Sequence, residues 1–128
     1  MKIDKTLPVH YRYDSYASSE GVKIKLSRYY PVRETECFYF VIEEWQALIN
    51  DPKQKRVGKN SLRKYCYPTM KDALESFKAR QNSRIWHANY SLAMANQSLL
   101  VLENTEVGEF EELKVGLPEF LQDLHWDI

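Results

Sequence analysis

The residues of this chain that could do chemistry are mostly basic and aromatic, and they concentrate in one segment. Between Asp51 and Arg84 ten Lys and Arg residues stand against three acids, a local net charge of +7. Lysine and arginine neutralise phosphates, and tyrosines among them can stack on unpaired bases. The segment therefore predicts a surface for an anionic partner, which could be nucleic acid or an acidic protein. Its candidate contact residues are Lys53, Lys55, Arg56, Lys59, Arg63, Lys64, Tyr65, Tyr67, Arg80 and Arg84.

The rest of the chain balances this charge. From Ile85 to Ile128 eight acids oppose a single lysine, giving −7 and a net charge of zero for the chain. A local field, not the net charge, steers partners. Either the acidic part packs against the basic segment and neutralises it, or each part meets its own partner. The candidate residues for a protein partner are Trp86, Tyr90, Glu109, Glu111, Glu112, Phe120, Leu124 and Trp126.

Motifs for catalysis are missing from the sequence. It has no Gly-rich dinucleotide loop, no phosphate-binding lysine loop and no H-E-x-x-H helix. His10, His87 and His125 lie far apart and without metal-ligand spacing. A nucleophilic pair of Cys66 and His87 stays open, because such partners meet in space, not in sequence. We predict no catalytic residues, no metal and no cofactor.

Hydrophobic periodicity predicts the elements that would position the basic segment. Residues 22–30 alternate like a half-buried strand that Pro31 ends, and residues 36–42 are a denser apolar run typical of a central strand covered on both faces. A basic loop over 53–61 and a third strand over 62–67 follow. Residues 1–21 are interpreted as an irregular N-terminal arm, with room for a short strand at 9–13. A short helix is expected over 43–50, after the second strand.

The clearest expectation is a long helix over Met70–Glu103. Thr69 is a good N-cap, with Asp72 three residues later as in a capping box. Apolar residues recur on one stripe, and Asn82, Asn89 and Asn96 recur every seven residues beside it, where a solvated flank or a coiled-coil register would explain them. The stripe consists of Met70, Leu74, Phe77, Ile85, Ala88, Leu92, Ala95, Leu99 and Leu102.

Together these elements predict one α+β domain over residues 1–128, a three-stranded antiparallel sheet packed on one long helix. Residues 104–128 form an acidic amphipathic segment with a second short helix at the C-terminus, which either folds back on the long helix or enters a partner's groove. The start of the chain resembles no signal peptide and no window resembles a membrane helix, so we expect a cytoplasmic location. Cys37 and Cys66 are expected to be reduced, buried thiols.

The run from Lys59 to Thr69 (KNSLRKYCYPT), followed by DALESFKAR from Asp72, resembles segments of small uncharacterised phage and prophage accessory proteins. The resemblance covers roughly residues 22–100 and implies a protein that acts on host or phage macromolecules. Such proteins include inhibitors of CRISPR and restriction systems. The leading hypothesis is a non-catalytic protein that blocks a host defence complex, and the alternative is a nucleic-acid-binding module. The expected partners are a host protein or ribonucleoprotein complex, nucleic acid as the alternative, and a second copy of the chain, but no membrane.

Overall fold

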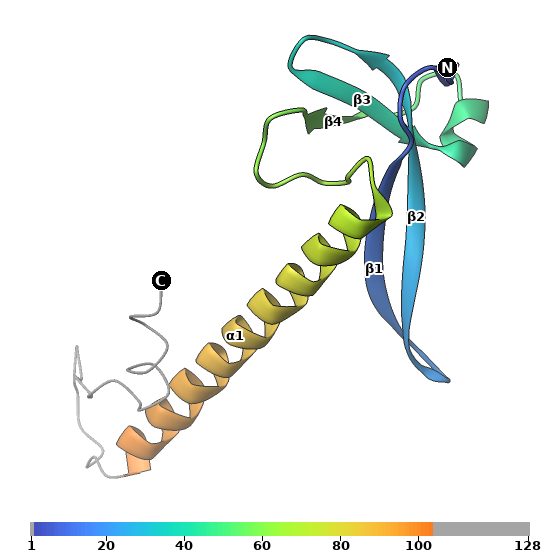
Figure 1. The fold of residues 1–128 in the computed structure, drawn as a ribbon. Coiled ribbons are helices and arrows are strands. Elements are labelled where there is room, and N and C mark those ends of the chain that lie inside the picture. The colour runs from blue at the N-terminus through green and yellow to red at the C-terminus, as the bar shows by residue number, and fades with distance from the viewer. Residues whose placement is uncertain (1, 104–128) are drawn as a thin grey trace. The chain divides into compact units, whose positions relative to one another are not determined.

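The computed structural model describes residues 2–103 and shows an α+β protein (Figure 1). Its elements are the strands β1 (His10–Ser18), β2 (Gly21–Glu34), β3 (Phe38–Glu43) and β4 (Lys55–Gly58), the 3-10 helix η1 (Glu44–Leu48) and the helix α1 (Met70–Glu103). The four strands form one curled antiparallel sheet in the order β1-β2-β3-β4. The chain divides into two compact units, residues 1–79 and residues 80–128, and each is described by itself.

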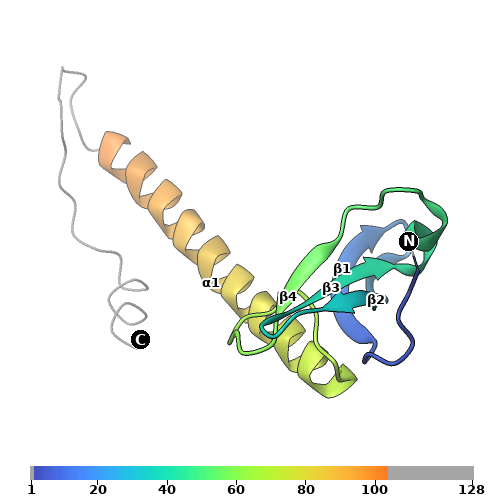
Figure 2. The same cartoon turned by 90° about the horizontal axis from the view of Figure 1, so that it is seen from above.

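The first hairpin corrects the expectation of an irregular arm over residues 1–21. β1 and β2 pair without interruption from His10 opposite Tyr29 to Ser18 opposite Gly21. Figure 2 shows the curled sheet from above. Gly21 closes the turn with a φ of 116°, a conformation that other residues rarely adopt. The strand was missed because β1 contains no Val, Ile or Leu, although Tyr11 and Tyr13 are half-buried in it.

β2 also differs from the expectation, because it does not end at Pro31. The strand continues to Glu34 across a register shift between Pro31 and Arg33. A bulge tolerates proline because the ladder there does not need its missing N–H. The carbonyl oxygen of Pro31 accepts a hydrogen bond from the N–H of Asp4 at 2.8 Å. The bulge sets which residues of β2 lie opposite β3.

The fourth strand lies where a loop was expected. β4 occupies Lys55–Gly58, while residues 62–67 make only an isolated bridge between Tyr67 and Tyr11. The two N–H···O distances of that bridge are 2.6 and 2.9 Å. The predictions of a basic loop over 53–61, a strand over 62–67 and a three-stranded sheet are therefore wrong. Only Val57 of β4 is buried, so the strand carried almost no apolar signal.

The short segment after β3 forms a 3-10 helix where a short helix was expected. Glu43 precedes η1, and the side chain of Gln46 accepts a hydrogen bond from the Glu43 N–H at 2.8 Å. The bonding pattern of a 3-10 helix suits such a short piece. The expected C-terminal helix and the acidic amphipathic segment 104–128 lie outside the described residues.

The core of the sheet unit is small and lies on the face of β3 that carries Tyr39 and Val41. Tyr29, Val41, Val57 and Cys66 are buried together, and Tyr39 and Tyr65 pack against them. Ile42, next to Val41 in β3, is also buried, so both faces of this strand are covered as predicted. Cys37 is exposed in the β2–β3 turn, which corrects the expectation that both thiols are buried. Both cysteines are free.

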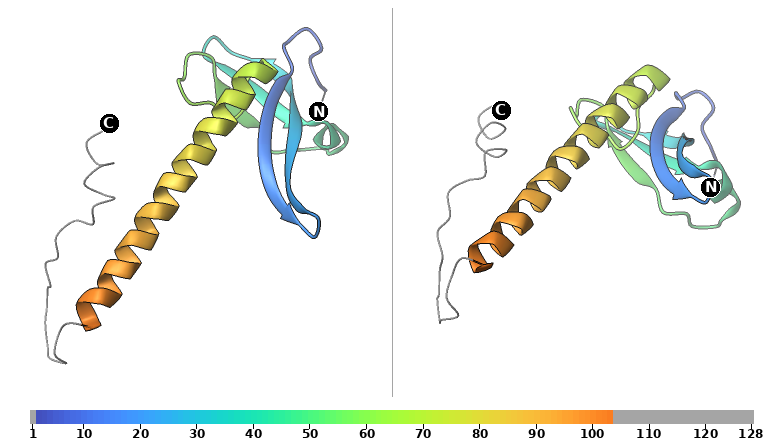
Figure 3. Two further views of the ribbon diagram at one scale, coloured as in Figure 1. Left: turned by 60° about the horizontal axis from the view of Figure 1, so that its bottom comes forward. Right: turned by 90° about the horizontal axis from the view of Figure 1, so that it is seen from below.

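The helix α1 begins at Met70 as predicted and continues through Glu103, the last described residue. The Thr69 hydroxyl accepts a hydrogen bond from the Asp72 N–H at 3.2 Å, which confirms Thr69 as the N-cap. Within the sheet unit Phe77 lies with its ring 6.5 Å from that of Tyr13, measured between centroids. Ala73 and Phe77 are the buried residues of α1. Figure 3 shows α1 as one uninterrupted helix.

Candidate nucleic-acid interface

The strand register gathers two phenylalanines and two arginines on one face of the sheet, the face opposite to the core residues Val41 and Val57. Phe38 and Phe40 are two residues apart in β3 and so share a face. Arg33 of β2 and Arg56 of β4 both lie opposite Phe40, one on each side. We call these four residues the arginine–phenylalanine face.

Each arginine of this face stacks on a phenylalanine ring. The guanidinium carbon of Arg33 lies 3.7 Å from the centroid of Phe40, and that of Arg56 lies 4.5 Å from the centroid of Phe38. Both arginines are exposed and both rings are half-buried. No ion pair within the described residues engages either guanidinium. The face therefore holds two orientated cations whose hydrogen-bond donors remain available to an anion.

A second group of cations surrounds Tyr65 and ties the segment after β4 to the core. The Tyr65 ring lies 4.1 Å from the guanidinium of Arg12 and 3.7 Å from the ammonium of Lys55. Its hydroxyl is 3.1 Å from that of Tyr29, and its carbonyl oxygen accepts a hydrogen bond from Arg12 at 2.7 Å. Burial and the contact with Tyr65 raise the pKa of Tyr29 far above its usual value. This group holds the fold, so Lys55 and Tyr65 have structural partners.

Lys59 and Lys64 are also engaged within the sheet unit. The ammonium of Lys59 pairs with Glu34 at 2.7 Å, and the hydrogen bond to that carboxylate raises the lysine's pKa. Lys64 donates from Nζ to the Lys59 carbonyl oxygen at 3.1 Å, and its backbone N–H donates to the Tyr67 hydroxyl at 3.2 Å. These residues order the loop after β4.

The remaining predicted contact residues divide between the two units. Lys53 and Arg63 are exposed in the sheet unit. Arg80 and Arg84 belong to the second unit, so the arginine–phenylalanine face is defined without them, and Arg84 donates to the Gln81 side chain at 2.9 Å. The second unit also carries a stacked pair of Trp86 and Tyr90, with ring centroids 5.4 Å apart. Outside the described residues lie Glu109, Glu111, Glu112, Phe120, Leu124 and Trp126.

Sequence reasoning missed Arg33, Phe38 and Phe40. The alternation in CFYFVI placed the two phenylalanines on one face, and that signal was present in the sequence. Their arginine partners could not be found without the register, which depends on the bulge after Pro31. The candidate site therefore shifts from the predicted basic region 53–84 to the strands β2, β3 and β4, and Arg56 is common to both.

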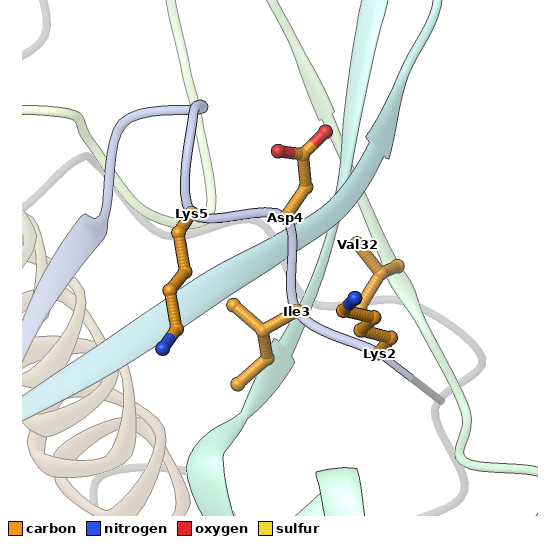
Figure 4. Close-up of a pocket in the computed structure, with 5 residues that line it drawn as sticks. All are labelled: Lys2, Ile3, Asp4, Lys5 and Val32. Atoms are coloured by element: carbon orange, nitrogen blue, oxygen red, sulfur yellow. The ribbon is translucent and has the colours of Figure 1, made fainter.

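Other features of the described residues lack the arrangement of a reactive centre. Burial raises the pKa of the Cys66 thiol to about 12, so the nucleophilic pair with His87 is not supported. No group of three or more His, Cys, Asp or Glu side chains within residues 2–103 could hold a metal ion. An open pocket lined by Lys2, Ile3, Asp4, Lys5 and Val32 lies at the N-terminal segment. Figure 4 shows its Asp4 and Lys5 side chains leaving the segment in different directions, so its polar groups do not converge.

Comparisons with known proteins do not place the chain in a family. No protein-family model, curated protein or solved structure matches it. None of the described helices is long and apolar enough to cross a membrane. The site must therefore be interpreted from its own charges and contacts.

Proposed function

We propose that the sheet unit binds single-stranded nucleic acid through the arginine–phenylalanine face. The observation that carries this proposal is the pairing of two exposed guanidinium groups with two half-buried phenylalanine rings on adjacent strands. Sheet faces that combine stacking rings with basic side chains are a common solution for binding single strands.

The chemistry of the four side chains fits this ligand. An arginine presents a planar fork of N–H donors that matches the oxygens of a phosphate. When the guanidinium of Arg33 turns to a phosphate, the Phe40 ring beneath it becomes available to a base. The two rings are separated by two residues, about 7 Å along an extended strand, so each can meet a different base. Because every base can stack on a phenylalanine ring, we expect little preference among the four bases.

The charge of the sheet unit supports the same ligand. Residues 1–79 contain fifteen Lys and Arg and ten Asp and Glu, a net charge of +5. Glu34 and Asp14 are paired with Lys59 and Arg12, and within the described residues neither arginine of the face forms an ion pair. A field of this sign raises the local concentration of an anionic chain and speeds its association.

Fluorescence anisotropy with labelled single strands of about twelve nucleotides tests the proposal, with a duplex of the same sequence as a comparison. We expect binding of DNA and RNA single strands at ~50 mM salt and weaker binding of the duplex. Phe40→Leu keeps an apolar side chain but removes the ring, so it should weaken binding by about 1–3 kcal/mol, roughly 5- to 150-fold. Leu62→Ala, at a side chain that is 98% exposed, is the control. An affinity that Phe40→Leu leaves unchanged, or no binding at ~50 mM salt, contradicts the proposal.

The second candidate function is a phage-type, non-catalytic inhibitor that blocks a host defence complex. The observation that favours it is the second unit, which joins the aromatic pair Trp86 and Tyr90 to a net charge of −5. Aromatic residues are enriched at protein interfaces, and the acids could imitate phosphates toward a basic groove. A pull-down with the full chain should recover a stoichiometric host protein or ribonucleoprotein complex that the double variant Trp86→Ala, Tyr90→Ala releases. A partner that this variant retains would exclude the aromatic pair as its contact.

A further inference from the structure

One side of α1 in the second unit is apolar, uncharged and open to solvent. The side chains of Ile85, Leu92, Leu99 and Leu102 are 60, 59, 64 and 53% exposed, and Ala88 and Ala95 between them are exposed as well. No Asp, Glu, Lys or Arg occurs from Ile85 to Leu102. We call these six residues the Ile85 stripe. An exposed apolar helix side of this length indicates that another helix or segment packs against it.

The opposite side of the same helix is different. Trp86, Ala93, Gln97 and Val101 are half-buried, and the Trp86 ring stacks on Tyr90 at 5.4 Å between centroids. The four large side chains of the Ile85 stripe are more exposed than Tyr90, Met94 and Leu100, which are 39, 43 and 50% exposed. Its spacing of three and four residues over 85, 88, 92, 95, 99 and 102 is the heptad spacing of a coiled-coil seam.

We propose that the Ile85 stripe pairs antiparallel with the same stripe of a second copy of this chain. In such a pair the two-fold axis lies between Ala93 and Met94. Leu92 then lies level with the partner's Ala95, and Leu99 lies level with the partner's Ala88. Ile85 lies level with the partner's Leu102. The stripe is thus complementary to the same stripe of a second copy that runs in the opposite direction.

The order of large and small residues decides between the two directions. In an antiparallel pair each of the four central layers joins one leucine to one alanine, so all four have equal volume. In a parallel pair the layers would alternate between Leu92 facing Leu92 and Ala95 facing Ala95. The alanine layers would then leave voids, which close packing penalises. The antiparallel order fills the seam evenly and lets the two backbones approach.

The flanks of the stripe agree with this direction. Asn89 lies roughly level with the partner's Asn96 on one flank, and Ser91 lies roughly level with the partner's Ser98 on the other. These short polar side chains do not hinder a close approach, and the asparagines can hydrogen-bond to each other. At the ends Arg84 comes level with the partner's Glu103, but Arg84 lies on the serine flank and Glu103 on the asparagine flank, so no like charges face each other across the seam. The seven-residue repeat of Asn82, Asn89 and Asn96 is thereby explained as one polar flank of the seam.

The length of the stripe sets the expected strength. Eighteen residues span about 27 Å at 1.5 Å per residue, which is two and a half heptads. A seam of this length should give a dimer that depends on protein concentration. The other occupant that the sequence offers is residues 104–128 of the same chain, and that arrangement would leave the protein monomeric.

Sedimentation equilibrium of the full chain between about 1 and 200 µM tests the pairing. We expect a dimer that Leu92→Lys weakens at least tenfold, because two charges would face the centre of the seam. Met94→Lys is the matched control, since it lies two residues away on another side of the helix and is 43% exposed. It should leave the dissociation constant within about twofold. A monomer throughout the range, or a dimer that Leu92→Lys does not weaken, overturns the proposal.

Disulfide cross-linking tests the direction. In a Cys37→Ser background, a mixture of the Ile85→Cys and Leu102→Cys variants should form a heterodimeric disulfide under mild oxidation. Each variant alone should not, because its two cysteines would lie about 25 Å apart in the antiparallel pair. A disulfide dimer of Ile85→Cys alone, with none in the mixture beyond it, would show a parallel pair and overturn the proposed direction.

Discussion

Replacing Arg33 and Arg56 by glutamine should reduce the salt dependence of single-strand binding. Four exposed cations enter the estimate, namely Arg33 and Arg56 of the arginine–phenylalanine face and Lys53 and Arg63, which flank β4 in the sequence. If each neutralises one phosphate, the slope of log K against log salt is about −0.7 per contact, or −2.8 in all. Affinity would then fall roughly 50-fold from 50 to 200 mM salt. Without the two arginines the slope becomes about −1.4, and the same change in salt costs only about sevenfold.

Titrations by fluorescence anisotropy at four or five salt concentrations measure these slopes. The matched control is Lys25→Gln with Lys71→Gln, which removes the same charge from exposed positions outside the face. The control should lower affinity slightly and keep the slope near that of the unchanged protein. Cation–π contacts at exposed sites contribute about 0.5–1 kcal/mol, so neither double variant should unfold the sheet. Equal slopes for the two double variants would refute the assignment of phosphate contacts to Arg33 and Arg56.

Three further predictions follow from the core and its thiols. The pKa of His10 is lowered, mainly by burial, so the unfolded chain binds this proton more readily than the folded one; the free energy of unfolding should fall as pH drops below about 6.5, with His10→Phe reducing the effect in urea titrations. Val41→Ala should cost about 2–3 kcal/mol in the same assay, because Val41 is fully buried, whereas Val22→Ala at a 77% exposed site should cost less than about 0.5 kcal/mol. Iodoacetamide at neutral pH should label the exposed Cys37 and leave Cys66, whose pKa is raised to about 12, unlabelled until denaturant is added; rapid labelling of Cys66 would contradict its burial.

The sequence was sufficient for the elements with strong local signals. The start of the helix α1 could be predicted to the residue because Thr69 caps it, and its uninterrupted course because no Gly or Pro occurs in it. The apolar run ending at Ile42 likewise identified a strand covered on both faces. In both cases the information lies in neighbouring residues.

The strands β1 and β4 required information that neighbouring residues do not carry. β4 has one buried side chain, Val57. The hydrogen-bonded pairing of β4 with β3 is what makes this segment a strand. β1 is half-buried along most of its length, and its backbone also bonds to Tyr67 at the other edge. Long-range hydrogen bonds between backbones override weak local preferences in such segments.

The candidate site shows the same division. The sequence located the basic segment, and Arg56 belongs to the arginine–phenylalanine face. Lys59 and Lys64, however, are held by Glu34 and by a backbone carbonyl, and Lys55 lies on Tyr65. Charge counting cannot distinguish a cation with a structural partner from one that is available. The contacts in the structure make that distinction. The register across the bulge at Pro31 adds Arg33 to the candidate site, because it puts Arg33 opposite Phe40.

Proton–nitrogen NMR correlation spectra of the full chain during titration with a single strand of about twelve nucleotides test the central claim most directly. The proposed function predicts the largest shifts at the amides of β3 and at the side-chain Nε–H signals of Arg33 and Arg56. The signals of the β1–β2 turn around Gly21 should stay in place as an internal control. Shifts confined to other parts of the chain, or unchanged arginine signals at saturation, would contradict the assignment of the arginine–phenylalanine face as the binding site.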